Sequence, residues 1–400
     1  MNCCLGGAWA GVFAVVLPLL AYDIPWNAGL MRPVTILAPG GSICNASLPA
    51  PVSKGGTGTM WSIRNAAMLA ISKMLGCSDD YWQEAMGIWE GAVPLPVLSG
   101  KNQFGDSFGF LIMDGSAGGC GAKAVGDGVD SAGNQVTSTL SIPNIETHEA
   151  NNPVLFLFRR QVKDSPGAGK YRGGAGIEEM LMVYDTDRVH ATLTMNGLEV
   201  PNAEGIFGGL PGSCNYWGMV RDSSVLENLR GGVIPQTIEE FGRQVEDLPG
   251  GVPSMELSQA DLFYFRCTGG GGYGDPLDRT PDAVLADVLN GLISVDQAYQ
   301  VFGVVVDGKG DRLNMEDTKT RRQSILKERL KLVTHQEPVR RVDGARRVRR
   351  RGEYLEIAEA SGEKFIRCTR CGVYICPADQ NPKAWAIQGK FPLQKAGPLF

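Results

Sequence analysis

Histidine is scarce in this chain of 400 residues, which contains His148, His190 and His335 and no other. None is close to another in the sequence, which argues against a metal site built on paired histidines. Three scattered histidines also offer no recognisable Ser-His-Asp arrangement for nucleophilic catalysis. The phosphate-binding order G-x-x-x-x-G-K-[ST] is missing as well, so the chain is not a P-loop nucleotide hydrolase.

A disulfide framework is missing too. The ten cysteines are scattered, apart from Cys368, Cys371 and Cys376. We interpret most of them as small buried residues in a reducing compartment, and we expect a cytoplasmic location. Charge is unevenly placed, because residues 319–351 carry 13 Lys or Arg and three Asp or Glu, although the whole chain has a net charge of −5. The rest of the chain is therefore acidic.

The longest apolar run, Leu5 to Tyr22, has 18 residues and no charge. A signal peptide and a membrane helix are the alternatives to a buried helix. No Lys or Arg precedes the run, glycines dilute it, Pro18 interrupts it, and its length is barely enough to span a bilayer. We therefore expect a core helix that is covered on all sides, and no contact with a membrane.

Glycine is unusually frequent, at 53 residues or about 13% of the chain against a usual ~7%. The glycines follow no collagen-like period, so they indicate tight turns and close backbone approaches. Short apolar segments between them predict a mostly antiparallel sheet, and the helices are grouped, which is typical of an α+β fold. The expected strands are residues 33–39, 154–158, 180–184, 189–194 and 261–267.

Helix signals and changes in composition predict how the chain is organised. Apolar spacing indicates a helix over 62–74, with Ser62 as its N-cap and Gly76 as its stop. Helix starts are also indicated at Thr280-Pro281 and at Ser294-Val-Asp-Gln297. The expected units are a glycine-rich core with packed helices over 1–276, a helical segment over 277–335, an arginine-rich linker over 336–351 and a small cysteine-containing tail over 352–400.

The segment from Asp164 to Gly176 lies between two predicted strands and is the sharpest local feature. Its glycines permit positive φ, and their N–H groups could face an anion. Lys170 and Arg172 add positive charge beside them. The alternative is a glycine-built connection with a surface lysine and arginine.

Six separated parts of the sequence, in order, resemble the hydantoinase B/oxoprolinase family. The most specific is Asp164–Gly176. The resemblance covers roughly residues 20–276 and implies the C-terminal portion of the family domain. The other parts are Asp23–Pro33, Gly118–Ala122 with Asp127-Gly-x-Asp130, Asn144–Glu149 with Pro153, Phe207–Gly212 and Gly269–Gly274.

Members of this family hydrolyse cyclic amides such as hydantoins and 5-oxoproline with ATP, or carboxylate ketones such as acetone and acetophenone. The resemblance implies a subunit of such a hydrolase or ligase, with ATP bound by a hydantoinase A-type partner. A ketone or a cyclic amide is the expected substrate. A non-catalytic scaffold or truncated paralogue of such a complex is the alternative.

Family chains are usually longer and carry a paired-His and Asp region that resembles a metal site. This sequence shows no such region before residue 20. The comparison implies that the divalent metal of the family is not held by this chain, and that a separate N-terminal half is a further possible partner.

The resemblance also suggests site residues. Lys170 and Arg172 are expected to contact phosphate or carboxylate oxygens. Glu146 and Glu149 are expected to be acid, base or orienting groups, with structural anchoring as the alternative. An E-x-x-E pair shares one face of a helix but points to opposite faces of a strand. The expected anion-binding residues are Asp164, Gly167, Gly169 and Gly173.

The sequence Cys368-Thr-Arg-Cys371-Gly, with Cys376 following, resembles half of a zinc ribbon. A fourth ligand is not obvious, because no histidine follows. Free structural cysteines and a redox pair are the alternatives to a zinc site.

The arginines of residues 340–351 lack interleaved aromatic residues, and the remaining chain is acidic. We therefore expect no nucleic-acid binding. A solvated linker, or a strip that docks on an acidic partner subunit, is the expected role.

Overall fold

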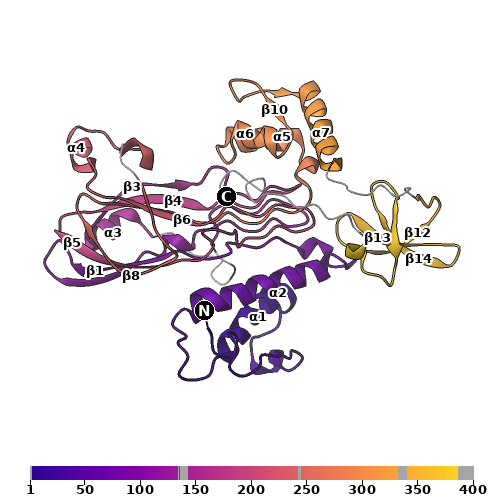
Figure 1. Cartoon of the computed structure of the whole chain (residues 1–400), viewed down its shortest axis with the longest axis horizontal. Coiled ribbons are helices and arrows are strands. Elements are labelled where there is room, and N and C mark those ends of the chain that lie inside the picture. Colours follow the sequence, from indigo (N-terminus) through magenta and orange to yellow (C-terminus); the bar gives the residue numbers. More distant parts are fainter. Residues whose placement is uncertain (1, 134, 136–142, 242–244, 332–339, 386–400) are drawn as a thin grey trace.

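The computed structural model describes the chain except for residues 1, 134, 136–142, 242–244, 332–339 and 386–400. Four parts lie around a central layer of extended segments (Figure 1). A sandwich of two sheets, a pair of N-terminal helices, a helical cluster and a small C-terminal sheet surround it. Within the described residues, no helix is long and apolar enough to cross a bilayer.

Two antiparallel sheets form the sandwich, with strand orders β2-β1-β5-β8 and β3-β4-β9-β6-β7. Alternation selects the inward faces, because Val189, Ala191 and Leu193 of β5 are buried and the residues between them are exposed. These side chains share one core with Leu181 and Phe263 of the facing sheet. The strands are β1 Leu95–Lys101, β2 Ser107–Leu111, β3 Val154–Gln161, β4 Ile177–Val183, β5 Arg188–Thr194, β6 Tyr216–Val220, β7 Glu246–Asp247, β8 Gly251–Ser258 and β9 Leu262–Arg266.

The α+β prediction is confirmed, and four of the five expected strands are present as β3, β4, β5 and β9. The strand expected over 33–39 is wrong, because residues 34–39 have no regular structure. Prolines stand at both ends of that segment, and among the described residues no strand pairs with it.

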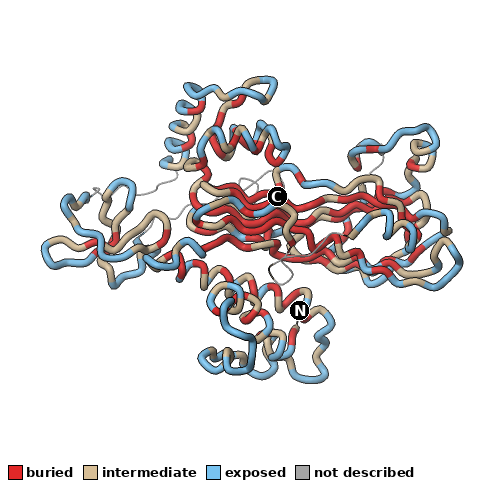
Figure 2. The backbone as a smooth tube through the Cα atoms, turned by 180° about the vertical axis from the view of Figure 1, so that it is seen from behind, coloured by how far each residue is buried: buried red, intermediate tan, exposed pale blue. Residues whose placement is uncertain are grey.

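Five glycine-rich segments lie side by side in the central layer: residues 85–92, 117–131, 165–176, 203–214 and 267–274. We call this layer the glycine bundle; Figure 2 shows that it is largely buried. Its segments exchange backbone hydrogen bonds, such as Gly270 N to Gly174 O at 2.9 Å and Gly174 N to Cys120 O at 2.8 Å. A Cβ atom added to Gly119 would lie 1.8 Å from Gly174 O. Only glycine fits where backbones approach this closely, as on the axis of a collagen triple helix.

Helices α1 (Leu5–Leu20) and α2 (Met60–Leu75) pack together below the glycine bundle (Figure 1). The predicted stop at Gly76 is confirmed as the C-cap of α2. The predicted N-cap is wrong, because α2 begins at Met60 and the Ser62 hydroxyl donates to Gly58 O instead. Burial of α1 on all sides is also wrong, since Leu20 is 51% exposed.

The helical cluster contains α5 (Pro281–Leu289), α6 (Val295–Gln300), α7 (Met315–Leu330) and the hairpin of β10 (Val305–Val306) with β11 (Leu313–Asn314). Both predicted helix starts are confirmed. The Thr280 hydroxyl accepts from Ala283 N, and the Ser294 hydroxyl accepts from Gln297 N. Apolar residues of the cluster pack on Ala168 and Leu210 of the glycine bundle.

The C-terminal sheet has the order β12 (Arg346–Arg350), β13 (Leu355–Ala360), β14 (Glu363–Cys368) and β15 (Tyr374–Pro377). Part of the expected linker 336–351 is therefore strand β12, and residues 336–339 lie outside the described part. Strand β12 pairs with β13 in a register that places Arg346 opposite Glu359 and Arg350 opposite Glu356. Opposite charges therefore face each other across the two strands. Two short helices, α3 (Ile145–Asn151) and α4 (Val225–Arg230), complete the fold.

Candidate functional site

The predicted anion-binding segment, Asp164 to Gly176, is one layer of the glycine bundle. Its amides are already used: Gly167 N donates to Gly270 O at 2.9 Å, and Gly173 N donates to Gly167 O at 2.9 Å. An added Cβ on Gly169 would lie 2.5 Å from Tyr171 O. The expectation that these N–H groups face an anion is therefore wrong for Gly167 and Gly173, because neighbouring backbone carbonyls occupy them.

Asp164 joins the glycine bundle to the helical cluster. It adopts a left-handed conformation with φ of 63°. Its carboxylate accepts from Ser294 N at 2.7 Å, at the start of α6, and its own N donates to Leu292 O at 2.9 Å. These contacts give Asp164 a structural position between two units of the fold.

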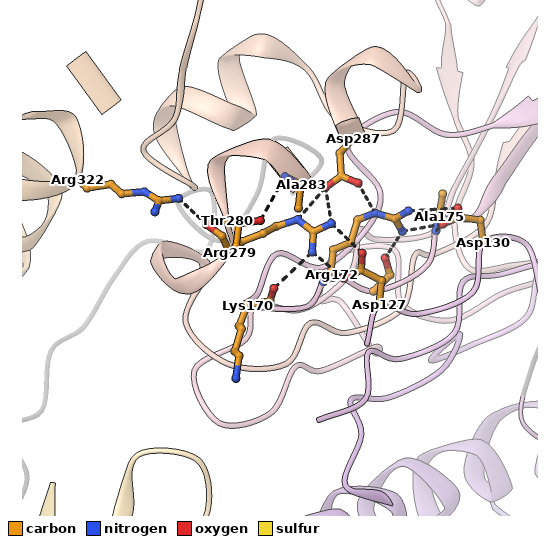
Figure 3. Close-up of polar contacts among 11 residues, drawn as sticks. Asp127, Asp130, Lys170, Arg172, Ala175, Arg279, Thr280, Ala283, Asp287 and Arg322 are labelled. Atoms are coloured by element: carbon orange, nitrogen blue, oxygen red, sulfur yellow. Dashed lines mark hydrogen bonds and ion pairs between the residues drawn. The ribbon is translucent and has the colours of Figure 1, made fainter. Parts of the chain in front are cut away.

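Arg172 is buried, with 7% exposure, and forms the centre of an ion-pair network (Figure 3). Its Nη1 lies 2.8 Å from Asp130 Oδ1, and its Nε lies 2.9 Å from Asp287 Oδ1. Arg279 extends the network, with Nη1 2.6 Å from Asp127 Oδ1 and Nη2 2.8 Å from Asp287 Oδ2. The alternative of a surface arginine is therefore wrong, and the donors of the buried Arg172 are held by carboxylates of the same chain.

The network pairs two arginines, Arg172 and Arg279, with three aspartates, Asp127, Asp130 and Asp287. Burial alone would lower the pKa of Arg172, but hydrogen bonds and charge from Asp130 and Asp287 raise that pKa above its usual range. Burial raises the pKa of Asp287, and the guanidinium groups of Arg279 and Arg172 oppose that shift. Both arginines therefore stay charged and fasten the helical cluster to the glycine bundle.

Lys170 lines a cavity of about 300 Å³ at the edge of this network. The cavity lies between the glycine bundle and the start of α5. The Lys170 ammonium is 2.9 Å from Glu353 Oε1, in the turn between β12 and β13. The other lining residues are Gly126, Asp127, Tyr171, Asp278, Arg279, Thr280 and Ala283.

Glu146 and Glu149 lie on α3, in the sandwich and away from α5 (Figure 1). The helical alternative for this pair is confirmed. Glu146 is exposed, whereas Glu149 Oε1 accepts from Phe156 N at 2.8 Å and so anchors α3 to β3. His148 between them packs on Phe110, with 4.7 Å between ring centroids. The fold does not bring the glutamates to Lys170 or Arg172.

The three C-terminal cysteines are spread over the small sheet. Cys368 ends β14, Cys371 is exposed in the following turn, and Cys376 is buried in β15 opposite Ile366. Throughout the described residues, no three His, Cys, Asp or Glu side chains gather in a way that could hold a metal ion. Cys376 is buried whereas Cys371 is exposed, and the zinc site stays a prediction.

Sequence reasoning missed a second buried group of charges, in the sandwich. Glu179 of β4 is fully buried, and burial, then the charge of Asp114, raise its pKa well above the usual range. Asp114 Oδ2 lies 3.0 Å from Arg159 Nη1. The sequence signal for Glu179 was its position midway between Ile177 and Leu181. Alternate residues of a strand face the same side, so a strand that buries those two side chains also buries Glu179.

The network around Arg172 was also missed, although Asp127 and Asp130 had been noted as landmarks. The third carboxylate of the network, Asp287, lies in a different unit, 115 residues from its partner Arg172. No local sequence spacing predicts a pair such as Arg172 and Asp287.

Comparison with known proteins identifies the family of this chain. The hydantoinase B/oxoprolinase family model matches residues 1–276. The acetophenone carboxylase delta subunit of Aromatoleum aromaticum is 28% identical over 274 residues, which are 66% of this chain and 39% of that protein. The caprolactamase subunit beta of Pseudomonas jessenii is 29% identical over 318 residues, which are 78% of this chain and 50% of that protein.

A solved structure shares the fold. The nucleotide-free acetone carboxylase structure superposes with a TM-score of 0.76 at 24% identity, over 84% of this chain and 46% of that chain. This chain thus spans about half of the length, or less, of the relatives that it matches. Because the family model covers more than two thirds of its residues, the chain belongs to the hydantoinase B/oxoprolinase family.

Proposed function

We propose that this chain is a subunit of an ATP-dependent cytoplasmic enzyme that acts on carbonyl compounds. The supporting observation is the family match over residues 1–276, which is shared with subunits of ketone carboxylases, a caprolactamase and a hydantoinase. The reaction would be either carboxylation of a ketone or hydrolysis of a cyclic amide. A hydantoinase A-type subunit would bind ATP.

Both reactions follow one physical logic. A partner would use ATP to convert an inert carbonyl into a phosphorylated species. This subunit would hold that species, or its acceptor, away from water. Lys170 is our proposed contact to phosphate or carboxylate oxygens, because Lys170 lines a cavity. Arg172 would position the Lys170 segment rather than touch the ligand, and the acid or base roles of Glu146 and Glu149 stay predictions.

Co-expression tests this proposal. The chain is expected to co-purify with a hydantoinase A-type subunit, together with any separate N-terminal half. The complex should hydrolyse ATP when a ketone with bicarbonate, or a cyclic amide, is added. A monodisperse chain that turns over such substrates by itself, without ATP, would contradict the proposal.

A non-catalytic scaffold is the second candidate. The observation in its favour is that the guanidinium groups of Arg172 and Arg279 are paired with carboxylates of this same chain. A Lys170→Met complex that assembles and keeps full ATP-dependent turnover would favour the scaffold. A neighbouring reading frame for a separate N-terminal half would instead favour a split enzyme.

A further inference from the structure

Glu353 reaches from the C-terminal sheet into the edge of the glycine bundle. It lies in the turn between β12 and β13, beyond the residues that the family model matches. Its Oε1 lies 2.9 Å from Lys170 Nζ, and its Oε2 accepts from Tyr273 Oη at 3.0 Å. Arg350 Nη2 adds a third donor, 2.8 Å from Oε2.

These contacts have the features of a carboxylate receptor. Two cations and one hydroxyl converge on a single carboxylate, and charge-assisted donors of this kind bind carboxylates strongly. The Glu353 side chain is 11% exposed and Tyr273 is fully buried, so water competes little for the donors. The Arg350 guanidinium is held in place over the Trp82 ring, at 4.3 Å from its centroid.

The receptor borders the cavity described above. Lys170 belongs to both, because it contacts Glu353 and lines the cavity. The same turn reaches a second lining residue, since the Tyr354 hydroxyl donates to Asp278 Oδ2 at 2.7 Å. Lys170 and Asp278 therefore connect the receptor to the edge of the cavity.

We propose that Lys170, Tyr273 and Arg350 form a carboxylate-binding site beside the cavity, and that Glu353 is its intramolecular occupant, which keeps the site closed to carboxylates from solution. The class of ligand rests on the proposed function. Carboxylation of a ketone yields a carboxylate, and so does opening of a cyclic amide ring. The product of either reaction could therefore replace Glu353 at these donors.

Chemical rescue tests the site without any turnover, so its result does not depend on the proposed function. Glu353→Ala, in the full chain or its co-purified complex, removes the occupant and leaves the donors. Acetate should then raise the melting temperature and protect Lys170 from acylation, measured by mass spectrometry, whereas chloride at equal ionic strength should do neither. The wild-type chain should show no response that is specific to acetate.

Two controls sharpen the test. Glu359→Ala removes a carboxylate of the same sheet that pairs with Arg346, and it should show no rescue by acetate. Lys170→Met combined with Glu353→Ala should lose the rescue, because the receptor loses a cation. If Glu353→Ala does not fold, Glu353→Gln serves, with faster acylation of Lys170 than in the wild type as the expected result. A folded Glu353→Ala chain without any acetate-specific shift, or a Gln variant with unchanged acylation, would overturn the proposal.

Discussion

The chain passes repeatedly from the sandwich into the glycine bundle, but the two regions are stabilised by different contacts. Side chains pack in the sandwich, and backbones pack in the glycine bundle. In the sandwich, large side chains such as Leu181 and Phe263 fill the space between two sheets. In the bundle, backbones pack directly on backbones, and Gly173 leaves no room for a Cβ, which would lie 1.9 Å from Gly270 O. The comparison teaches that a residue without a side chain can be as constrained as a core leucine. It also explains why glycines such as Gly167 and Gly173 of the sharpest sequence motif contact neighbouring backbone.

The largest effect is expected from Gly119→Ala in the bundle. The added methyl would overlap Gly174 O at 1.8 Å, and both partners are backbone that cannot rotate away. We expect a loss above about 5 kcal/mol, comparable with the whole stability of a domain, and thus little soluble protein. Soluble yield and thermal melts measure this.

Two further variants sharpen this comparison. Gly126→Ala adds the same methyl where nothing lies within 4 Å, so it should change stability by less than about 0.5 kcal/mol. Leu181→Ala in the sandwich core should cost about 2–5 kcal/mol through a cavity rather than a clash. A Gly119→Ala chain that melts like Gly126→Ala would refute the backbone packing.

Arg172→Met tests the polar contact between the bundle and the helical cluster. Removal of the guanidinium leaves Asp130 and Asp287 without their shared partner, and breaking such a buried pair costs about 3–5 kcal/mol. The resemblance implied that Arg172 contacts phosphate or carboxylate oxygens, whereas its burial among carboxylates of the same chain predicts a loss of stability. Circular dichroism melts measure the effect.

Arg160→Met is the matched control, because Arg160 pairs with Glu178 at a side-chain exposure of 42% and should cost at most about 1 kcal/mol. If Arg172→Met melts like the control while turnover falls, Arg172 is a ligand-binding residue after all.

Glu179→Gln tests the buried charge in the sandwich through its pH dependence. Burial and Asp114 raise the pKa of Glu179, so the folded chain keeps a proton that the unfolded chain releases above about pH 4.3. Wild-type stability is therefore lost as pH rises toward the folded pKa, by about 1.4 kcal/mol for each pH unit in that window. Gln does not ionise, so the variant should gain stability over wild type at about pH 8 and not at about pH 4. Equal differences at both pH values would show that Glu179 is ionised in the fold.

The smallest effect is expected on α3. Glu149→Gln weakens a charge-assisted hydrogen bond to Phe156 N and should cost about 1 kcal/mol. Glu146→Gln, at an exposed position, should change stability by less than about 0.5 kcal/mol. Thermal melts of the two variants measure these changes in stability. A larger loss of stability for Glu146→Gln than for Glu149→Gln would contradict the anchoring role of Glu149.

Local signals predicted local structure well. Thr280 and Ser294 cap the helices that their sequences indicated, because a cap joins residues two or three positions apart. A short apolar segment predicted β5, and its period-two burial in the structure is a property of the strand itself. The helix at α1 was also found, but its exposed Leu20 was not, because burial depends on what packs beside the helix.

By itself, the sequence determined the family, the α+β class and the importance of the glycines between Asp164 and Gly176. The family follows from the resemblance of six separated segments to known members, and the fold class and the glycines follow from residue types and short spacings. Only the tertiary structure decided what those glycines and Arg172 do. Their partners, Gly270 and Asp287, are about a hundred residues away, and the same N–H or guanidinium group can bind a ligand or another part of the chain. Which of the two it binds depends on the packing of distant segments, and here that packing places a carbonyl and a carboxylate where an anion had been expected.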